Sequence, residues 1–347
     1  MVSDSVELLR RMVSIPSVSG QEEELAGFLA REMGARGFRA WVDEAGNAIG
    51  ELGAGPEEIL LLGHMDTVPG AIPVQIEGGA LYGRGAVDAK GPLAAFIAAA
   101  TQVGPLEGKR IVVCGAVEEE STTSKGARAL LGRRIPSVVI IGEPSGWDRI
   151  TLGYKGRLLA DYRLQRRMSH TAGPESGAPE QAVDFWLAAR DYAANYNQGR
   201  ARRFEMLDAS LRSIHTESDG LRESALLTIG FRIPPGLYPT DVEQALAPLA
   251  GPEAEVRFRG AELPYKAPKS TRLVAALLAG IRSRGGEPGF TLKTGTSDMN
   301  VVGPVWACPI AAYGPGDSTL DHTPEERLDL AEYERAIAVL AEALKRV

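Results

Sequence analysis

The chain has few of the residues that mark disulfide-rich or nucleic-acid-binding proteins. Its 347 residues include only two cysteines and four histidines, and the formal net charge is −7. Cys114 and Cys308 stand in apolar, strand-like surroundings, so neither a disulfide framework nor a thiolate metal site is expected. An acidic chain also lacks the basic field that general nucleic-acid binding requires.

Long apolar runs are missing as well. No stretch approaches the roughly 18 apolar residues that a membrane span needs. The first seven residues have neither the positive charge nor the apolar segment of a secretory signal. We therefore expect a cytoplasmic protein, long enough for a large core and two domains.

The order of the predicted elements indicates an α/β fold with a mostly parallel sheet flanked by helices. Apolar strands that alternate with helices are typical of such a sheet. The predicted strands lie near residues 38–43, 47–52, 59–64, 110–117 and 137–142, and the helices near 5–14, after 20, and at 91–103 and 126–132.

The pattern changes after about residue 153 and returns near 265. Between these points, alternating strands and two amphipathic helices predict a small α+β sandwich. We therefore predict a discontinuous larger domain of residues 1–152 and 264–347, with residues 153–263 inserted as a second domain. In the insert, a helix capped by Thr240 is expected at 241–249, and His215 is expected in a solvated loop.

The first candidate site follows the strand at 59–64. His64 and Asp66 stand two residues apart, so their side chains leave an extended chain on the same face. Metal-bound imidazoles commonly donate their second N–H to a carboxylate. His64 is thus a candidate ligand with Asp66 as its partner, although the pair alone also fits a plain hydrogen-bonded histidine.

Further carboxylates follow other strands. Asp88 stands in a glycine-flanked turn, Glu118–Glu120 follow one predicted strand, and Glu143 follows another. Open α/β sheets place their sites at these strand ends. Because crowded carboxylates repel one another, they indicate either solvent or cations. A solvated loop would explain Glu118–Glu120 alone, whereas convergence with His64, Asp88 and Glu143 favours a metal site.

Five motifs in order carry a family resemblance. They are His64-Met65-Asp66-Thr67-Val68-Pro69, Gly83-Arg84-Gly85 with Asp88-Ala89-Lys90-Gly91, Glu118-Glu119-Glu120, Gly142-Glu143-Pro144 and His322-Thr323-Pro324-Glu325. The chain resembles the dinuclear zinc aminoacylase and carboxypeptidase family, which includes acetylornithine deacetylase, succinyl-diaminopimelate desuccinylase and glutamate carboxypeptidase. The resemblance implies a zinc exopeptidase-like catalytic domain and an insert used for dimerisation.

The resemblance also implies roles for the motif residues. Asp88 would bridge two divalent cations, which His64 and Glu143 on one side and Glu120 and His322 on the other would complete. Glu119 would be the general base and Asp66 the partner of His64. The family commonly has Asp-Glu-Glu where this chain has Glu118-Glu119-Glu120, so a register with Glu118 as base and Glu119 as ligand stays open. Zinc is the expected metal, and cobalt or manganese also suits these ligands.

In the inserted domain, the resemblance implies residues that contact substrate. Ser169-His170-Thr171 resembles the family segment whose histidine reaches into the partner subunit's site to stabilise an oxyanion, with a surface-loop histidine as the alternative. Arg232 resembles an arginine that grips a substrate carboxylate. Beyond the insert, the loop with Thr296 and Ser297 resembles the substrate-side loop near the metals.

The segments at 115–126 and 295–300 resemble hydrolases that release lysine, or ornithine, from the terminal glutamate γ-carboxyl of an amino-group carrier protein in lysine and arginine biosynthesis. Arginines at 166–167 and 200–203 could attract an acidic carrier, or be ordinary solvated residues. Two rivals remain: an acetylornithine deacetylase or succinyl-diaminopimelate desuccinylase, and a non-catalytic metal-bound dimeric scaffold. An uncoordinated Glu119 among the ligands argues against the scaffold.

Overall fold

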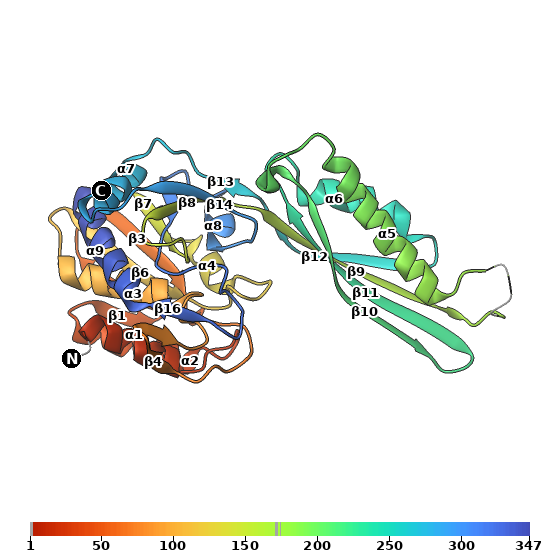
Figure 1. The fold of residues 1–347 in the computed structure, drawn as a ribbon, viewed down its shortest axis with the longest axis horizontal. Coiled ribbons are helices and arrows are strands. Elements are labelled where there is room, and N and C mark those ends of the chain that lie inside the picture. The colour runs from red at the N-terminus through yellow and green to blue at the C-terminus, as the bar shows by residue number, and fades with distance from the viewer. Residues whose placement is uncertain (1–2, 171–172, 174) are drawn as a thin grey trace. The chain divides into compact units, whose positions relative to one another are not determined.

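The computed structural model describes residues 3–170, 173 and 175–347, so Thr171 of the Ser169–Thr171 motif lies outside the described residues. The chain divides into two compact units (Figure 1). The first unit comprises Met1–Gly153, Ala267–Leu292 and Ser297–Val347, and the second comprises Tyr154–Lys266 and Lys293–Thr296. Residues 293–296 belong to the second unit, which the sequence did not predict.

A mixed sheet forms the centre of the first unit. Its strands follow the order β1-β2-β6-β3-β7-β15-β8, and β14 also pairs with β8. β6, β3, β7 and β15 are parallel, whereas β2 and β8 join them antiparallel. The predicted α/β class is confirmed, with antiparallel strands added on both sides of a parallel centre. The bounds are Arg39–Val42 (β1), Ala48–Gly53 (β2), Glu57–His64 (β3), Lys109–Ala116 (β6), Val138–Gly142 (β7), Arg149–Tyr154 (β8), Gly289–Lys293 (β14) and Ile310–Ala312 (β15).

Helices surround this sheet, and several begin at side-chain caps. Ser3, Thr271 and Asp329 each accept a backbone N–H of the first turn of α1, α7 and α9. The helices of the first unit are Asp4–Ser14 (α1), Glu23–Ala35 (α2), Lys90–Val103 (α3), Lys125–Leu130 (α4), Arg272–Ser283 (α7), Asp298–Val302 (α8) and Leu330–Arg346 (α9).

Glycines on the central strands let α3 approach the sheet closely. Gly63 of β3 is the register partner of both Gly115 and Gly142 on the neighbouring strands. A Cβ on Gly142 would lie 2.8 Å from the ring of Phe96 in α3. The row of glycines therefore lets α3, which begins at Lys90 two residues after Asp88, pack close to the sheet.

A small three-stranded sheet joins two distant segments of the first unit. Arg327–Asp329 (β16) pairs with Ala80–Tyr82 (β5), which pairs with Gln75–Glu77 (β4). This pairing brings the chain just after His322 beside the chain that leads to Asp88.

The second unit is a four-stranded antiparallel sheet with two helices. The strand order is β10-β11-β9-β12. Tyr162 of β9 stacks on Phe185 of α5 with ring centroids 4.9 Å apart, within the apolar core of this unit. The bounds are Gly156–Arg167 (β9), Asp208–Ser218 (β10), Arg222–Ile233 (β11), Glu255–Glu262 (β12), Ala178–Tyr196 (α5) and Pro239–Leu246 (α6), with 3₁₀ turns at Arg203–Glu205 and Ala247–Ala250. The short strand Tyr265–Lys266 (β13) is not part of this four-stranded sheet.

Two local predictions in the second unit are wrong. His215 lies in β10, an outer strand, where it is exposed and pairs with Glu217. The outward-facing polar residues of β10 gave this strand the composition of a loop. Helix α6 begins at Pro239 with Tyr238 as its N-cap, so Thr240 lies inside the first turn. Proline is favourable at that position because it needs no donor there.

Candidate metal centre

Three parallel strands end side by side and deliver the candidate residues. His64 is the last residue of β3, and its register partner is Ala116 at the end of β6. Gly142 at the end of β7 pairs with Gly63. The chain that continues from β6 therefore places Glu118–Glu120 near His64, and the chain after β7 adds Glu143.

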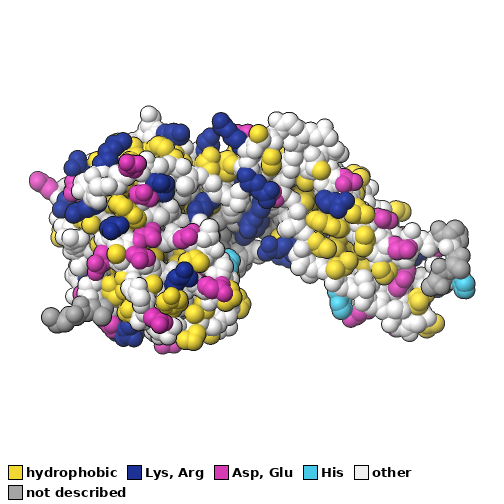
Figure 2. Space-filling view, viewed as in Figure 1, with side chains coloured by type: hydrophobic (Ala, Val, Ile, Leu, Met, Phe, Trp, Pro, Cys, Tyr) yellow, Lys and Arg dark blue, Asp and Glu magenta, His cyan; other side chains and the backbone are white. Residues whose placement is uncertain are grey.

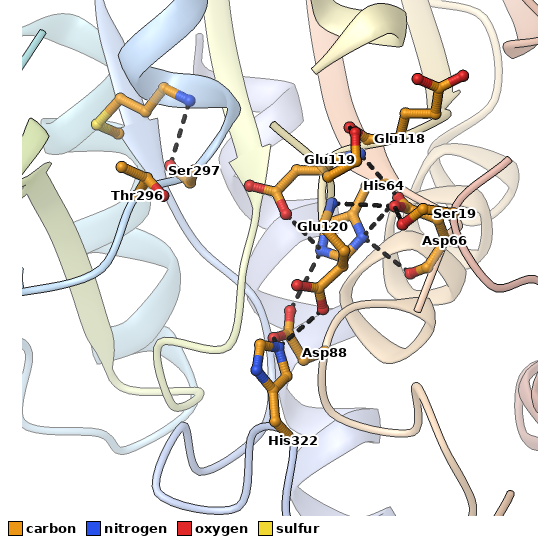
Figure 3. Close-up of polar contacts among 12 residues, drawn as sticks. Ser19, His64, Asp66, Asp88, Glu118, Glu119, Glu120, Thr296, Ser297 and His322 are labelled. Carbon is orange, nitrogen blue, oxygen red and sulfur yellow. Dashed lines mark hydrogen bonds and ion pairs between the residues drawn. The ribbon is translucent and has the colours of Figure 1, made fainter. Parts of the chain in front are cut away.

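Asp88, Glu120 and His322 form a compact group of potential metal ligands. One ligand atom of each lies within 4.8 Å of the others. His322 Nε2 is 2.8 Å from Glu120 Oε1 and 3.0 Å from Asp88 Oδ2 (Figure 3). Two carboxylates and an imidazole at this spacing fit a divalent cation such as zinc.

The other oxygen of Asp88 faces the second histidine. Asp88 Oδ1 lies 3.2 Å from His64 Nε2. The two oxygens of one carboxylate thus address two imidazoles, His64 and His322. Such a placement suits a carboxylate that could be shared by two cations.

The carboxylates of Asp88 and Glu120 make this group favourable for a bound positive charge. Hydrogen bonds to Asp88 and Glu120 raise the pKa of His322 to about 10. The pKa of Asp88 lies far below its usual value despite burial, because both histidines stabilise its charged form. A site that stabilises imidazolium in this way also stabilises a metal cation.

Glu119 sits beside the group without belonging to it. Its Oε2 is 3.9 Å from His64 Nε2. Burial raises the pKa of Glu119 well above its usual value, and the negative charges of Glu143 and Glu120 add to this, whereas His64 opposes it. Glu143 itself is buried at the end of β7. Glu119 is thus a carboxylate with raised proton affinity next to the potential ligands Asp88, Glu120 and His322.

Asp66 orients the backbone of Glu119 and Glu120 and contacts the imidazole of His64. Its Oδ1 accepts the backbone N–H of Glu119 at 3.0 Å, and its Oδ2 accepts that of Glu120 at 2.9 Å. Oδ1 also lies 3.3 Å from His64 Nδ1, and Ser19 donates its hydroxyl to Oδ2. Burial raises the pKa of Asp66, but the bonds from His64, Ser19 and Glu120 outweigh it and keep that pKa low. Ser19 was not predicted from the sequence, because it stands in a turn before α2 and matches no motif.

The remaining predicted residues lie in other surroundings. Arg232 in β11 donates from Nη1 to the Thr296 hydroxyl at 3.0 Å, within the second unit. Ser297 is buried and accepts the N–H of Met299, so it caps α8. His170 is exposed in the chain that follows β9.

The parallel strand ends and the converging carboxylates and imidazoles are those of a metal-dependent hydrolase. The chain belongs to peptidase family M20/M25/M40, whose family model matches residues 60–346. This confirms the family resemblance and the hydrolase class.

None of the helices in the described part of the chain combines the length and the apolar composition that a membrane span requires.

Curated relatives align with almost the whole chain. A protein of Deinococcus radiodurans named [LysW]-lysine hydrolase is 51% identical over 98% of this chain and 96% of its own. A protein of Thermococcus kodakarensis named putative [LysW]-lysine/[LysW]-ornithine hydrolase is 39% identical over 99% of this chain and 92% of its own.

Solved structures share the fold at low sequence identity. The M20 metallo-carboxypeptidase Sso-CP2 of Sulfolobus solfataricus superposes with a TM-score of 0.81 at 19% identity, covering 99% of both chains. Bacillus subtilis YXEP, described as a dinuclear metal-binding peptidase, has a TM-score of 0.68 at 13% identity over 99% of this chain and 98% of its own.

We predict that Asp66→Asn weakens metal binding and turnover by about 10- to 100-fold, the usual cost of losing an outer-shell partner. The N–H groups of Glu119 and Glu120 bond to different oxygens of Asp66, so in asparagine one of them would face the amide NH₂ group. Competition between the protein and a chelator for Zn²⁺ measures the change. Asp43→Asn is the matched control, because Asp43 accepts two backbone N–H groups in the β1–β2 turn. Equal Zn²⁺ affinity in the two variants would contradict the role of Asp66.

Proposed function

We propose that the chain hydrolyses the amide between lysine or ornithine and the γ-carboxyl of the terminal glutamate of an acidic amino-group carrier protein. The 51% identity to the Deinococcus radiodurans protein, along nearly the full length of both chains, carries this proposal. The reaction would serve lysine and arginine biosynthesis in the cytoplasm.

The proposed centre holds two divalent ions, most favourably zinc, with cobalt as the alternative. His64 and Glu143 would hold one with Asp88, and Glu120 and His322 the other. The position of Asp88 between His64 and His322 supports this assignment. When bound, such a pair of ions supplies Lewis acidity, which lowers the pKa of water and polarises an amide carbonyl.

Glu119 is the proposed general base. It takes a proton from the attacking water and gives it to the departing amine. Its raised pKa suits a group that accepts and then returns a proton. Glu118 turns away instead: its Oε2 accepts the Thr123 hydroxyl at 2.5 Å and its Oε1 lies 3.7 Å from Lys125 Nζ. This supports the register with Glu119 as base over the one with Glu118 (Figure 3).

Arg232, Thr296 and His170 are the proposed substrate contacts in the second unit. Arg232 would bind a substrate carboxylate, and the Thr296 hydroxyl would orient the guanidinium through the bond they already share. Ser297, which follows Thr296 in the same substrate-side loop, is proposed as a further substrate contact and also caps α8. The exposed His170 would enter the partner subunit's site and donate to the oxyanion.

The variant Glu119→Gln distinguishes a hydrolase that uses Glu119 as its base from a non-catalytic metal-bound scaffold. We expect turnover to fall by at least about 100-fold, the lower range for a lost general base, while metal content stays at the wild-type value. Turnover and metal per chain are measured on the same preparation. Undiminished turnover would eliminate Glu119 as the base, and loss of metal would make it a ligand instead.

The substrate is tested by side-by-side kinetics. We expect the purified enzyme to cleave carrier-linked lysine or ornithine with a kcat/KM well above that for N-acetylornithine or N-succinyl-diaminopimelate. A preference for either small conjugate would replace the carrier proposal by the corresponding deacylase activity.

The loop after α5 is the proposed contact for the carrier. Arg202 and Arg203 are 82% and 72% exposed, with Glu205 and Asp208 as partners. Positive surface charge accelerates association with an acidic partner, most strongly at low salt.

We expect Arg202→Glu with Arg203→Glu to lower kcat/KM for the carrier conjugate by about tenfold at low salt, with a smaller effect at high salt. Arg190→Glu with Arg257→Glu makes the same charge change elsewhere on the second unit, at exposed positions. Equal effects of the two double variants would show that net charge, rather than this loop, governs association.

A homodimer through the second unit is also proposed. Among the described strands, β10 pairs only with β11, so its outer edge is free to add a strand. Leu211 and Ile214 of β10 are 39% and 45% exposed, and Figure 2 shows further apolar side chains on the surface of this unit.

We expect Ile214→Lys to shift the protein from dimer to monomer in sedimentation velocity at micromolar concentration, because a charge would be buried at the strand edge. Ile135→Lys changes an isoleucine of the first unit with a similar exposure, 51% against 45%, and serves as the control. A wild-type monomer, or a dimer unaffected by Ile214→Lys, would contradict this interface.

A further inference from the structure

A buried glutamate connects the segments that carry Asp88 and His322. Glu326 follows His322 by four residues and is 1% exposed. None of the motifs above assigns it a role. Its Oε1 accepts the backbone N–H groups of both Val87 and Asp88, at 3.0 and 3.1 Å.

The second oxygen of Glu326 is paired with an arginine from the same region. Arg84 Nη1 lies 2.7 Å from Glu326 Oε2 and also donates to the backbone carbonyl of Thr323 at 3.2 Å. Thr323 is the residue after His322. The pair Glu326–Arg84 is thus bonded directly to the backbone of Asp88 and to that of the neighbour of His322.

Backbone pairing reinforces this connection on either side. Gly83 donates its N–H to the carbonyl of Glu326, and Arg327 is the register partner of Tyr82. These bonds hold the two segments together, and Glu326 and Arg84 extend the link as far as the backbone of Asp88 and Thr323. His322 needs such support because its own φ of 62° lies in the left-handed region that non-glycine residues rarely adopt.

We propose that Glu326 is a positioning residue that sets the separation of Asp88 and His322, and hence the affinity for the cation they would share with Glu120. The inference rests on the metal centre proposed above. Glu326 itself touches neither that cation nor substrate. It acts through the N–H of Asp88 and, by way of Arg84, through the chain beside His322.

The chemistry of the carboxylate explains why an amide cannot replace it. Both oxygens of Glu326 act as acceptors, one for two N–H groups and the other for a guanidinium. Glutamine has one acceptor oxygen, so its NH₂ group would face either those N–H groups or Arg84. A buried donor opposite a donor is unfavourable, and the two segments would have to move apart.

The test compares Glu326→Gln with Glu58→Gln. Glu58 is also buried and also paired with an arginine, Arg110, at 2.6 Å, but it lies at the opposite end of β3 from His64. Both variants lose a buried ion pair, so both should be less stable to urea. Only Glu326→Gln should weaken Zn²⁺ binding, by about 10- to 100-fold, in competition with a chromophoric chelator. The absorption spectrum of the Co²⁺-loaded protein should change in this variant alone.

Two results would count against these proposals, and they are distinguishable. Zn²⁺ affinity of Glu326→Gln within twofold of Glu58→Gln, with an unchanged Co²⁺ spectrum, would overturn the inference and leave the proposed function standing. A wild-type protein that binds no Zn²⁺ or Co²⁺ would overturn the proposed metal centre itself. If Glu326→Gln does not fold by circular dichroism, Glu326→Asp takes its place under the same criterion. It keeps the charge, but its shorter side chain cannot reach both Asp88 and Arg84.

Discussion

The proposed metal centre depends on the hydrogen bonds that the carboxylate of Asp66 accepts. Glu118, Glu119 and Glu120 follow one another in the chain, and their like charges would drive the loop apart without fixed partners. Asp66 accepts the N–H groups of Glu119 and Glu120 and lies against His64, so one buried side chain orients residues from two strands. The side chains can then diverge, with Glu120 facing His322 and Glu119 remaining apart from the ligand group.

The fold brings the remaining residues to the same place. Parallel strands β3, β6 and β7 end together, and the glycines at 63, 115 and 142 let α3 start close to the sheet. Asp88 stands just before that helix, and the β16–β5 pairing returns His322 from far along the chain. Asp66 accepts the backbone N–H groups of Glu119 and Glu120, and Glu326 accepts those of Val87 and Asp88, so two buried carboxylates orient the backbone of the proposed centre.

Much of this was predictable from the sequence, because strand ends and family motifs are local signals. The α/β class, the parallel central strands and the candidate residues His64, Asp88, Glu120 and His322 all followed from them. Glu326 did not, since its burial and partners depend on contacts more than 200 residues apart. β10 was missed because an outer strand with polar, exposed residues has no hydrophobic alternation to detect.

The proposed function depends on Asp88 lying between two cations. Anomalous X-ray diffraction from zinc-soaked crystals at the zinc absorption edge tests it most directly. We expect two peaks roughly 3.5 to 4 Å apart, one beside His64 and Glu143 and the other beside Glu120 and His322, with Asp88 between them and Glu119 bound to neither. A single peak, or peaks that Asp88 does not touch, would contradict it.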